Sequence, residues 1–150
     1  MIEPSILKEF SGKKVLVTGG TGLIGRQVVF VLTDVGANVT ITSLDNMIVD
    51  LRAQHIKGDL TDFGFCKEIT KDKDFVFHIA GIKGSVEVTK SKPASFFVPL
   101  IMMNTNMLEA CRINGVKKTV YTSSIGAYAS AEVFKEDENL WILQTDWYRL

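Results

Sequence analysis

Cysteine is scarce in this sequence, and its placement excludes two classes of protein. The 150 residues include only two cysteines, Cys66 and Cys111, which lie far apart and form no CxxC pair. A disulfide framework or a metal site is therefore not expected. Two buried thiols in a reducing compartment fit this pattern better, so we expect a cytoplasmic protein.

Net charge and long hydrophobic runs are also missing. Seventeen basic residues balance 17 acidic ones, which removes the electrostatic argument for nonspecific binding to nucleic acid or to an anionic membrane. The longest apolar run, 96–103, contains Pro99 and is far too short to span a bilayer. We therefore expect no nucleic-acid partner and no membrane partner. The apolar content of 46% suits one globular domain over residues 1–150.

Short β-rich runs alternate with stretches of helical periodicity. Strands separated by crossover helices form a parallel sheet with helices on both faces. The predicted fold class is therefore α/β, a doubly wound parallel sheet of about five strands. Pro99 is expected to kink or break the last helix. The expected strands are 14–18, 38–42, 54–57, 74–80 and 118–122, and the expected helices are 23–35, 61–70 and 93–114.

A glycine-rich loop, TGGTGLIG at residues 18–25, joins the first strand to the first helix. Gly19 permits a tight turn, Gly22 lets backbone N–H groups approach a pyrophosphate, and Gly25 lets the helix pack close to the sheet. The helix N-terminus then faces the phosphates with its positive dipole end. A strand before the loop, a helix after it and an acid downstream together predict a dinucleotide site.

The downstream acid is Asp45, which follows the second expected strand and precedes Asn46. A carboxylate at this place accepts hydrogen bonds from both hydroxyls of the adenosine ribose and repels the 2′-phosphate of NADP. The sequence therefore favours NAD as the cofactor. The alternative is that Asp45 only begins a turn with Asn46.

The motifs TGGTGLIG, LDN, GDLTD, FHIAG and YTSS together resemble the extended short-chain dehydrogenase/reductase family. More narrowly, they resemble its NAD-dependent nucleotide-sugar epimerases and dehydratases. This resemblance implies an NAD-binding Rossmann fold and hydride transfer between a sugar carbon and NAD, with a nucleotide sugar as substrate. It covers the N-terminal half of a typical member, so the later strands and the C-terminal substrate domain are expected to be absent. A non-catalytic NAD-binding module, or a truncated and degenerate relative, is the alternative.

The resemblance also carries cofactor contacts onto individual residues. Asp59 has a second interpretation as the cap of the next helix, for which Thr61 and Asp62 are also available. Lys83 has a second interpretation as a solvated loop residue. His78 is interpreted as a strand histidine with satisfied ring nitrogens, not as an acid or base. The implied cofactor-binding residues are Gly19, Thr21, Gly22, Leu23, Ile24, Gly25, Asp45, Asn46, Asp59, Leu60, Ile79, Ala80, Gly81, Lys83 and Thr122.

The resemblance implies two catalytic residues, Ser124 and Tyr148. The tyrosine would take a proton from a sugar hydroxyl, and the serine would hydrogen-bond the same oxygen. In the family a lysine four residues after the tyrosine lowers its pKa, and here that position lies beyond Leu150. We therefore expect the chain to be inactive alone. Tyr148 is alternatively an aromatic residue that covers an apolar surface.

One helix departs from the family pattern. The position of a usual family asparagine is occupied by Leu100, and the polar residues 104–106 follow one turn later. The apolar residues of this helix suit either packing within the monomer or a homodimer interface, as in the family.

Overall fold

The computed structural model describes residues 4–82 and 86–123. Its centre is a five-stranded sheet with the order β3-β2-β1-β4-β5, in which every neighbouring pair is parallel. This arrangement confirms the predicted doubly wound α/β sheet. The strands are β1 Lys14–Thr18, β2 Asn38–Ser43, β3 Gln54–Lys57, β4 Phe75–His78 and β5 Lys118–Tyr121.

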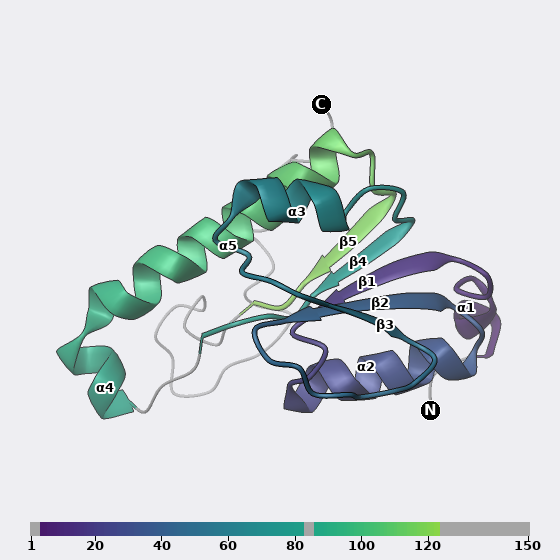
Figure 1. Cartoon of the computed structure of the whole chain (residues 1–150), viewed down its shortest axis with the longest axis horizontal. Helices are drawn as coiled ribbons and strands as arrows, with labels where there is room; N and C mark the ends of the chain where they lie inside the picture. Colours follow the sequence, from purple (N-terminus) through teal and green to yellow (C-terminus); the bar gives the residue numbers. More distant parts are fainter. Residues whose placement is uncertain (1–3, 83–85, 124–150) are drawn as a thin grey trace, which may run out of the picture.

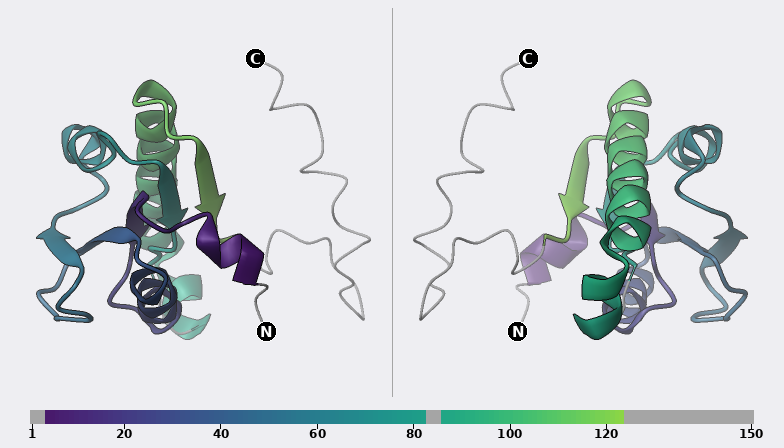
Figure 2. Two further views of the ribbon diagram at one scale, coloured as in Figure 1. Left: turned by 90° about the vertical axis from the view of Figure 1, so that its right-hand side faces the viewer. Right: turned by 90° about the vertical axis from the view of Figure 1, so that its left-hand side faces the viewer.

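Helices cover both faces of the sheet (Figure 1). α2 packs on one face, and α3 lies beside α5 on the other, as the side views of Figure 2 also show. The short helices α1 and α4 were not predicted. No helix of the described residues is both long and apolar enough to cross a bilayer. The helices are α1 Pro4–Lys8, α2 Leu23–Asp34, α3 Phe63–Ile69, α4 Val86–Ser91 and α5 Pro93–Ile113.

The core has two layers because the strands are buried on both faces. Val15 and Val17 of β1 face α2, whereas Leu16 between them faces α3 and α5. Both cysteines are buried free thiols in the second layer, as predicted. Burial raises the pKa of the Cys66 thiol to about 12, so this thiol is unreactive at neutral pH.

Pro99 does not end α5, which continues from Pro93 to Ile113. The expectation of a break is therefore wrong. A proline removes a single helical N–H donor, and the part of α5 beyond it is held by burial of Met103 and Met107 against the sheet. The apolar residues of this helix divide between two environments, because Phe97 and Ile101 remain exposed.

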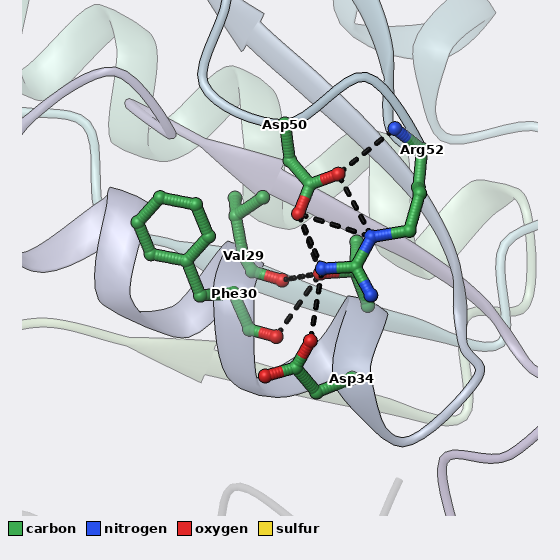
Figure 3. Close-up of polar contacts among 6 residues, drawn as sticks. Val29, Phe30, Asp34, Asp50 and Arg52 are labelled. Atoms are coloured by element: carbon green, nitrogen blue, oxygen red, sulfur yellow. Dashed lines mark hydrogen bonds and ion pairs between the residues drawn. The ribbon is translucent and has the colours of Figure 1, made fainter.

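The loop between β2 and β3 is fastened to the C-terminal end of α2 by a polar cluster (Figure 3). Arg52 forms ion pairs with Asp50 at 2.6 Å and with Asp34 at 2.9 Å. The Thr33 hydroxyl donates a hydrogen bond to Asp50 at 3.1 Å. We call these four residues the loop clasp. It fixes the far end of the loop that begins with Asp45.

Candidate functional site: the glycine loop and the carboxyl ends of the strands

The sheet topology places a switch point at the carboxyl ends of β1 and β4. The chain moves outward from β1 to β2 and β3, then returns to the other side of β1 with β4 and β5. In open α/β sheets, ligands bind outside the carboxyl ends of the strands at this reversal. Thr18 and His78 are the last residues of the two central strands and are paired in register.

The glycine loop is too tightly packed for larger residues. Gly19 has a φ of +65°, and a Cβ added there would lie 2.7 Å from Cα of Ala80. A Cβ on Gly25 would lie 2.8 Å from the carbonyl carbon of Gly19 and 2.8 Å from Cα of Gly20. The loop therefore lies against the end of β4 on one side and the first turn of α2 on the other. The roles expected for Gly19 as a tight turn and Gly25 as a close-packing position agree with these contacts.

The N-terminus of α2 lies beside this switch point, directly after the glycine loop. Gly22 is its N-cap residue, and among the described residues no side chain caps it. The first N–H groups of a helix have no acceptor within the helix. Leu23 and Ile24 beside them are exposed by 72% and 56%. An uncapped helix start bordered by apolar side chains suits a phosphate joined to a larger organic group. These residues therefore fit a dinucleotide.

Asp45 lies across from the glycine loop, and both of its carboxylate oxygens are held. Oδ1 accepts a hydrogen bond from the N–H of Met47 at 2.8 Å. Oδ2 accepts one from the hydroxyl of Thr21, also at 2.8 Å. These bonds, the Met47 bond foremost, lower the pKa of Asp45 below 3.8. Asp45 therefore does begin a turn, as the alternative proposed, and it is an oriented anion beside the loop as well. Asn46 next to it is exposed.

Asp59 lies after β3 and does not cap α3. Its Oδ1 accepts a hydrogen bond from the N–H of Thr61 at 2.9 Å, and Asp62 is the N-cap of α3. The alternative interpretation of Asp59 as a helix cap is therefore wrong, because α3 begins two residues later than expected, at Phe63. Asp59 is exposed and Leu60 is buried.

Asn106 of α5 holds the segment around Leu60 and was not among the predicted site residues. Its side-chain amide donates to the carbonyl oxygens of Leu60 at 3.0 Å and Thr61 at 2.9 Å. The polar residues 104–106 inside an apolar helix were the signal that could have located this contact.

The segment after β4 lies against the glycine loop. The backbone N–H groups of Ile79 and Ala80 both donate to the hydroxyl of Thr18, at 3.1 and 3.2 Å. Gly81 follows as an exposed residue. Thr122, after β5, donates its N–H and its hydroxyl to the carbonyl oxygen of His78 at 3.2 and 3.3 Å. These residues join the ends of β1, β4 and β5.

His78 is buried between these strand ends, and both of its ring nitrogens have partners. Nδ1 contacts the Thr18 hydroxyl at 2.7 Å, and Nε2 contacts Oδ1 of Asn104 at 3.0 Å. Because the Thr18 oxygen already accepts two N–H groups, the network assigns its proton to Nδ1 of the histidine, so that Nε2 carries the ring proton. Burial lowers the pKa of His78 below 6.5. The interpretation of His78 as a satisfied strand histidine is confirmed.

Asn104 extends this network to β5 by donating its side-chain amide to the Tyr121 hydroxyl at 3.0 Å. Thr18, Asn104 and Tyr121 were not among the predicted site residues, because no local pattern links three different elements. Lys83, Ser124 and Tyr148 lie outside the described residues. The structure brings the other predicted residues to the carboxyl edge of the sheet, and their roles toward a cofactor remain predictions.

Fold and site together define an α/β protein with a Rossmann-type parallel sheet and a glycine loop at its switch point. A model of the NAD dependent epimerase/dehydratase family matches residues 15–143, and the chain belongs to this family. This confirms the resemblance and, for the family, the cofactor NAD.

Two relatives illustrate the range of related proteins. UDP-glucose 4-epimerase of Yersinia enterocolitica is 30% identical over 133 residues, which are 79% of this chain and 39% of the relative. A 3 beta-hydroxysteroid dehydrogenase/Delta 5-->4-isomerase of Mycobacterium tuberculosis is 33% identical over 116 residues, covering 74% of this chain and 31% of the relative. The chain thus spans two fifths or less of the length of these relatives.

Solved structures agree with the family. An epimerase of Methanothermobacter thermautotrophicus superimposes with a TM-score of 0.78 at 29% identity, covering 89% of this chain and 42% of that one. UDP-N-acetylglucosamine 4-epimerase of Methanobrevibacter ruminantium, in complex with UDP-N-acetylmuramic acid, gives 0.73 at 32% identity, covering 86% of this chain and 44% of that one.

Proposed function

We propose that this chain binds NAD at the carboxyl ends of β1, β2 and β4 and forms the cofactor-binding part of a nucleotide-sugar epimerase or dehydratase. The observation that carries the proposal is the pairing of an uncapped helix start with an oriented carboxylate, Asp45, which is joined to the glycine loop by its bond to Thr21. The first supplies N–H donors for the pyrophosphate, and the second supplies acceptors for the ribose hydroxyls.

Different residues of the site would contact different parts of the cofactor. The backbone from Gly22 to Gly25 faces the phosphates, and Asp45 takes the adenosine ribose. Asp59 and the backbone of Leu60 would contact the adenine edge. Ala80 lies beside the glycine loop, where its small side chain would leave room for the dinucleotide. When bound, NAD would supply a hydride acceptor and donor.

The chemical roles of Ser124 and Tyr148 belong to the same proposal. The tyrosine takes the proton of a sugar hydroxyl, and the serine donates a hydrogen bond to that oxygen as its charge changes. The proposed substrate is a nucleotide sugar, in keeping with the relatives' names.

Isothermal titration of the 150-residue chain with NAD and with NADP tests the cofactor proposal. We expect saturable binding of NAD and weaker binding of NADP, and the Asp45→Ala variant should lose most of that difference. Absence of NAD binding by a folded chain refutes the proposal. Incubation with NAD and UDP-glucose tests the reaction separately. We expect no turnover by the chain alone, and turnover would contradict that expectation without affecting the cofactor proposal.

A further inference from the structure

We infer that Thr21 is a positioning residue, which orients the Asp45 carboxylate for the adenosine ribose and thereby sets the preference for NAD over NADP. This inference rests on the proposed function. It concerns the side chain of a loop residue, whereas the proposal above uses the loop through its backbone.

The first step is the geometry of the contact. Thr21 is 8% exposed, and its hydroxyl donates to Oδ2 of Asp45 at 2.8 Å. The two residues belong to different loops, one after β1 and the other after β2. The bond therefore joins the phosphate-binding segment to the ribose-binding segment.

The second step is the support of Thr21 itself. The guanidinium of Arg26 donates to the carbonyl oxygens of Thr21 and Gly22, each at 3.2 Å. A side chain one turn into α2 thus holds two consecutive carbonyl groups of the glycine loop. The hydroxyl is consequently presented from a fixed backbone.

The third step is the number of acceptor positions left on the carboxylate. An ionised carboxylate has about four lone-pair positions on its two oxygens. Thr21 occupies one on Oδ2, and the N–H of Met47 occupies one on Oδ1. One position remains on each oxygen, which matches the two neighbouring hydroxyls of a ribose.

The consequence is a specific role for the Thr21 hydroxyl. Asp45 is exposed, so without this bond its carboxylate is held at one oxygen and can turn about its last side-chain torsion. A carboxylate free to turn accepts the ribose diol less well, and it can also move away from a 2′-phosphate. Loss of the hydroxyl therefore weakens NAD binding and relaxes the exclusion of NADP.

The experiment compares Thr21→Val, which keeps the shape and removes the donor, with Thr21→Ser, which keeps the donor. NAD and NADP affinities are measured by titration calorimetry. Thr21→Val should weaken NAD binding by about 3- to 10-fold, the effect of one typical intramolecular hydrogen bond, because Asp45 keeps its charge and its bond to Met47. The ratio of NAD to NADP affinity should fall by a similar factor, and Thr21→Ser should stay within about 2-fold of the parent chain.

A matched control and a double variant separate positioning from a general structural effect. Thr70→Val removes another fully buried threonine hydroxyl, which donates to the carbonyl oxygen of Cys66 at 2.8 Å. Thr70 lies between α3 and the start of β4, at the opposite edge of the sheet from Asp45, and its replacement should leave both affinities unchanged. In an Asp45→Asn background, Thr21→Val should cause no further loss of NAD affinity, because its role acts through the carboxylate.

Three outcomes overturn the inference: unchanged NAD affinity in Thr21→Val, an equal loss of NAD and NADP affinity, or a full additional loss in the Asp45→Asn background. If Thr21→Val does not fold, Thr21→Ala is measured in its place. Failure of the parent chain to bind NAD refutes the proposed function, and this inference with it. Binding by the parent chain with any of the three outcomes refutes this inference alone.

Discussion

Gly25 lies in the first turn of α2, and its replacement by alanine tests whether the packing of this helix creates the phosphate site. Alanine is favoured over glycine inside a helix by about 1 kcal/mol, so propensity alone predicts a more stable protein. The structure predicts the opposite. An added Cβ would lie within 3 Å of backbone atoms of Gly19 and Gly20, which cannot rotate away as a side chain can.

The size of the effect follows from these two contributions. Overpacking a well-packed interior costs about 1–3 kcal/mol, and contacts with rigid backbone favour the upper end. After subtraction of the gain in propensity, we expect Gly25→Ala to lower the free energy of unfolding by about 2 kcal/mol. For a chain of this size that corresponds to a fall in Tm of roughly 4–8 °C. NAD affinity should fall more than 10-fold, because the N–H groups at the start of α2 move with the helix.

Urea unfolding of the variant and the parent chain, followed by titration with NAD, measures both effects. Gly64→Ala is the matched control, because Gly64 also lies inside a helix but its added Cβ would meet a side-chain oxygen of Asp62 at 3.1 Å. That oxygen can yield, so the control should stay within about 1 kcal/mol of the parent chain. A Gly25→Ala protein that is as stable as its parent and binds NAD normally would refute the reasoning.

Three further predictions concern buried polar groups and the loop clasp. The Thr42 hydroxyl is buried and has no hydrogen-bond partner within the described part of the chain, so Thr42→Val should raise the free energy of unfolding by about 1 kcal/mol in urea titrations; a loss of stability would show that the hydroxyl is satisfied. Burial holds the pKa of His78 below 6.5, so the unfolded chain binds the proton first and the free energy of unfolding should fall as the pH drops below 6.5. In the His78→Gln variant, the melting temperature should fall less between pH 7.5 and 5.5. An equal fall in the variant and the parent chain would contradict this prediction. Arg52 holds the pKa of Asp50 well below 3.8, so the ionised Asp50 stabilises the fold above pH 4 and this stabilisation is lost as the pH falls further. The Asp50→Asn variant should therefore melt at a lower temperature at pH 7, and its melting temperature should depend less on pH below 4. An unchanged pH dependence below 4 would argue against the loop clasp.

Local pattern was enough to predict much of the fold. The strands 14–18 and 54–57 and the helix after the glycine loop have nearly the predicted limits, because apolar periodicity and terminal glycines are local signals. Gly36 and Gly115, which end α2 and α5, have φ values of +80° and +66°. These left-handed conformations strongly favour glycine, so the sequence alone could show where both helices stop.

The sequence could not predict contacts between distant elements. It did not show that α5 would continue through Pro99, because this helix is stabilised by burial of residues that follow the proline. The structure also decided which of the polar residues before α3 caps it, Asp62 and not Asp59. For α5, packing against the sheet decided the outcome.

The sequence by itself determined the class of site: a glycine loop between a strand and a helix, followed by an acid, indicates a dinucleotide whatever the surrounding details. Only the tertiary structure showed that Thr21 bonds Asp45, that Asn106 holds the backbone at Leu60, and that His78 lies in a network running from Thr18 to Tyr121. These bonds join residues that lie 17 to 60 positions apart in the sequence. A parallel sheet brings the carboxyl ends of such segments together at one edge, and no short-range pattern encodes which side chains meet there.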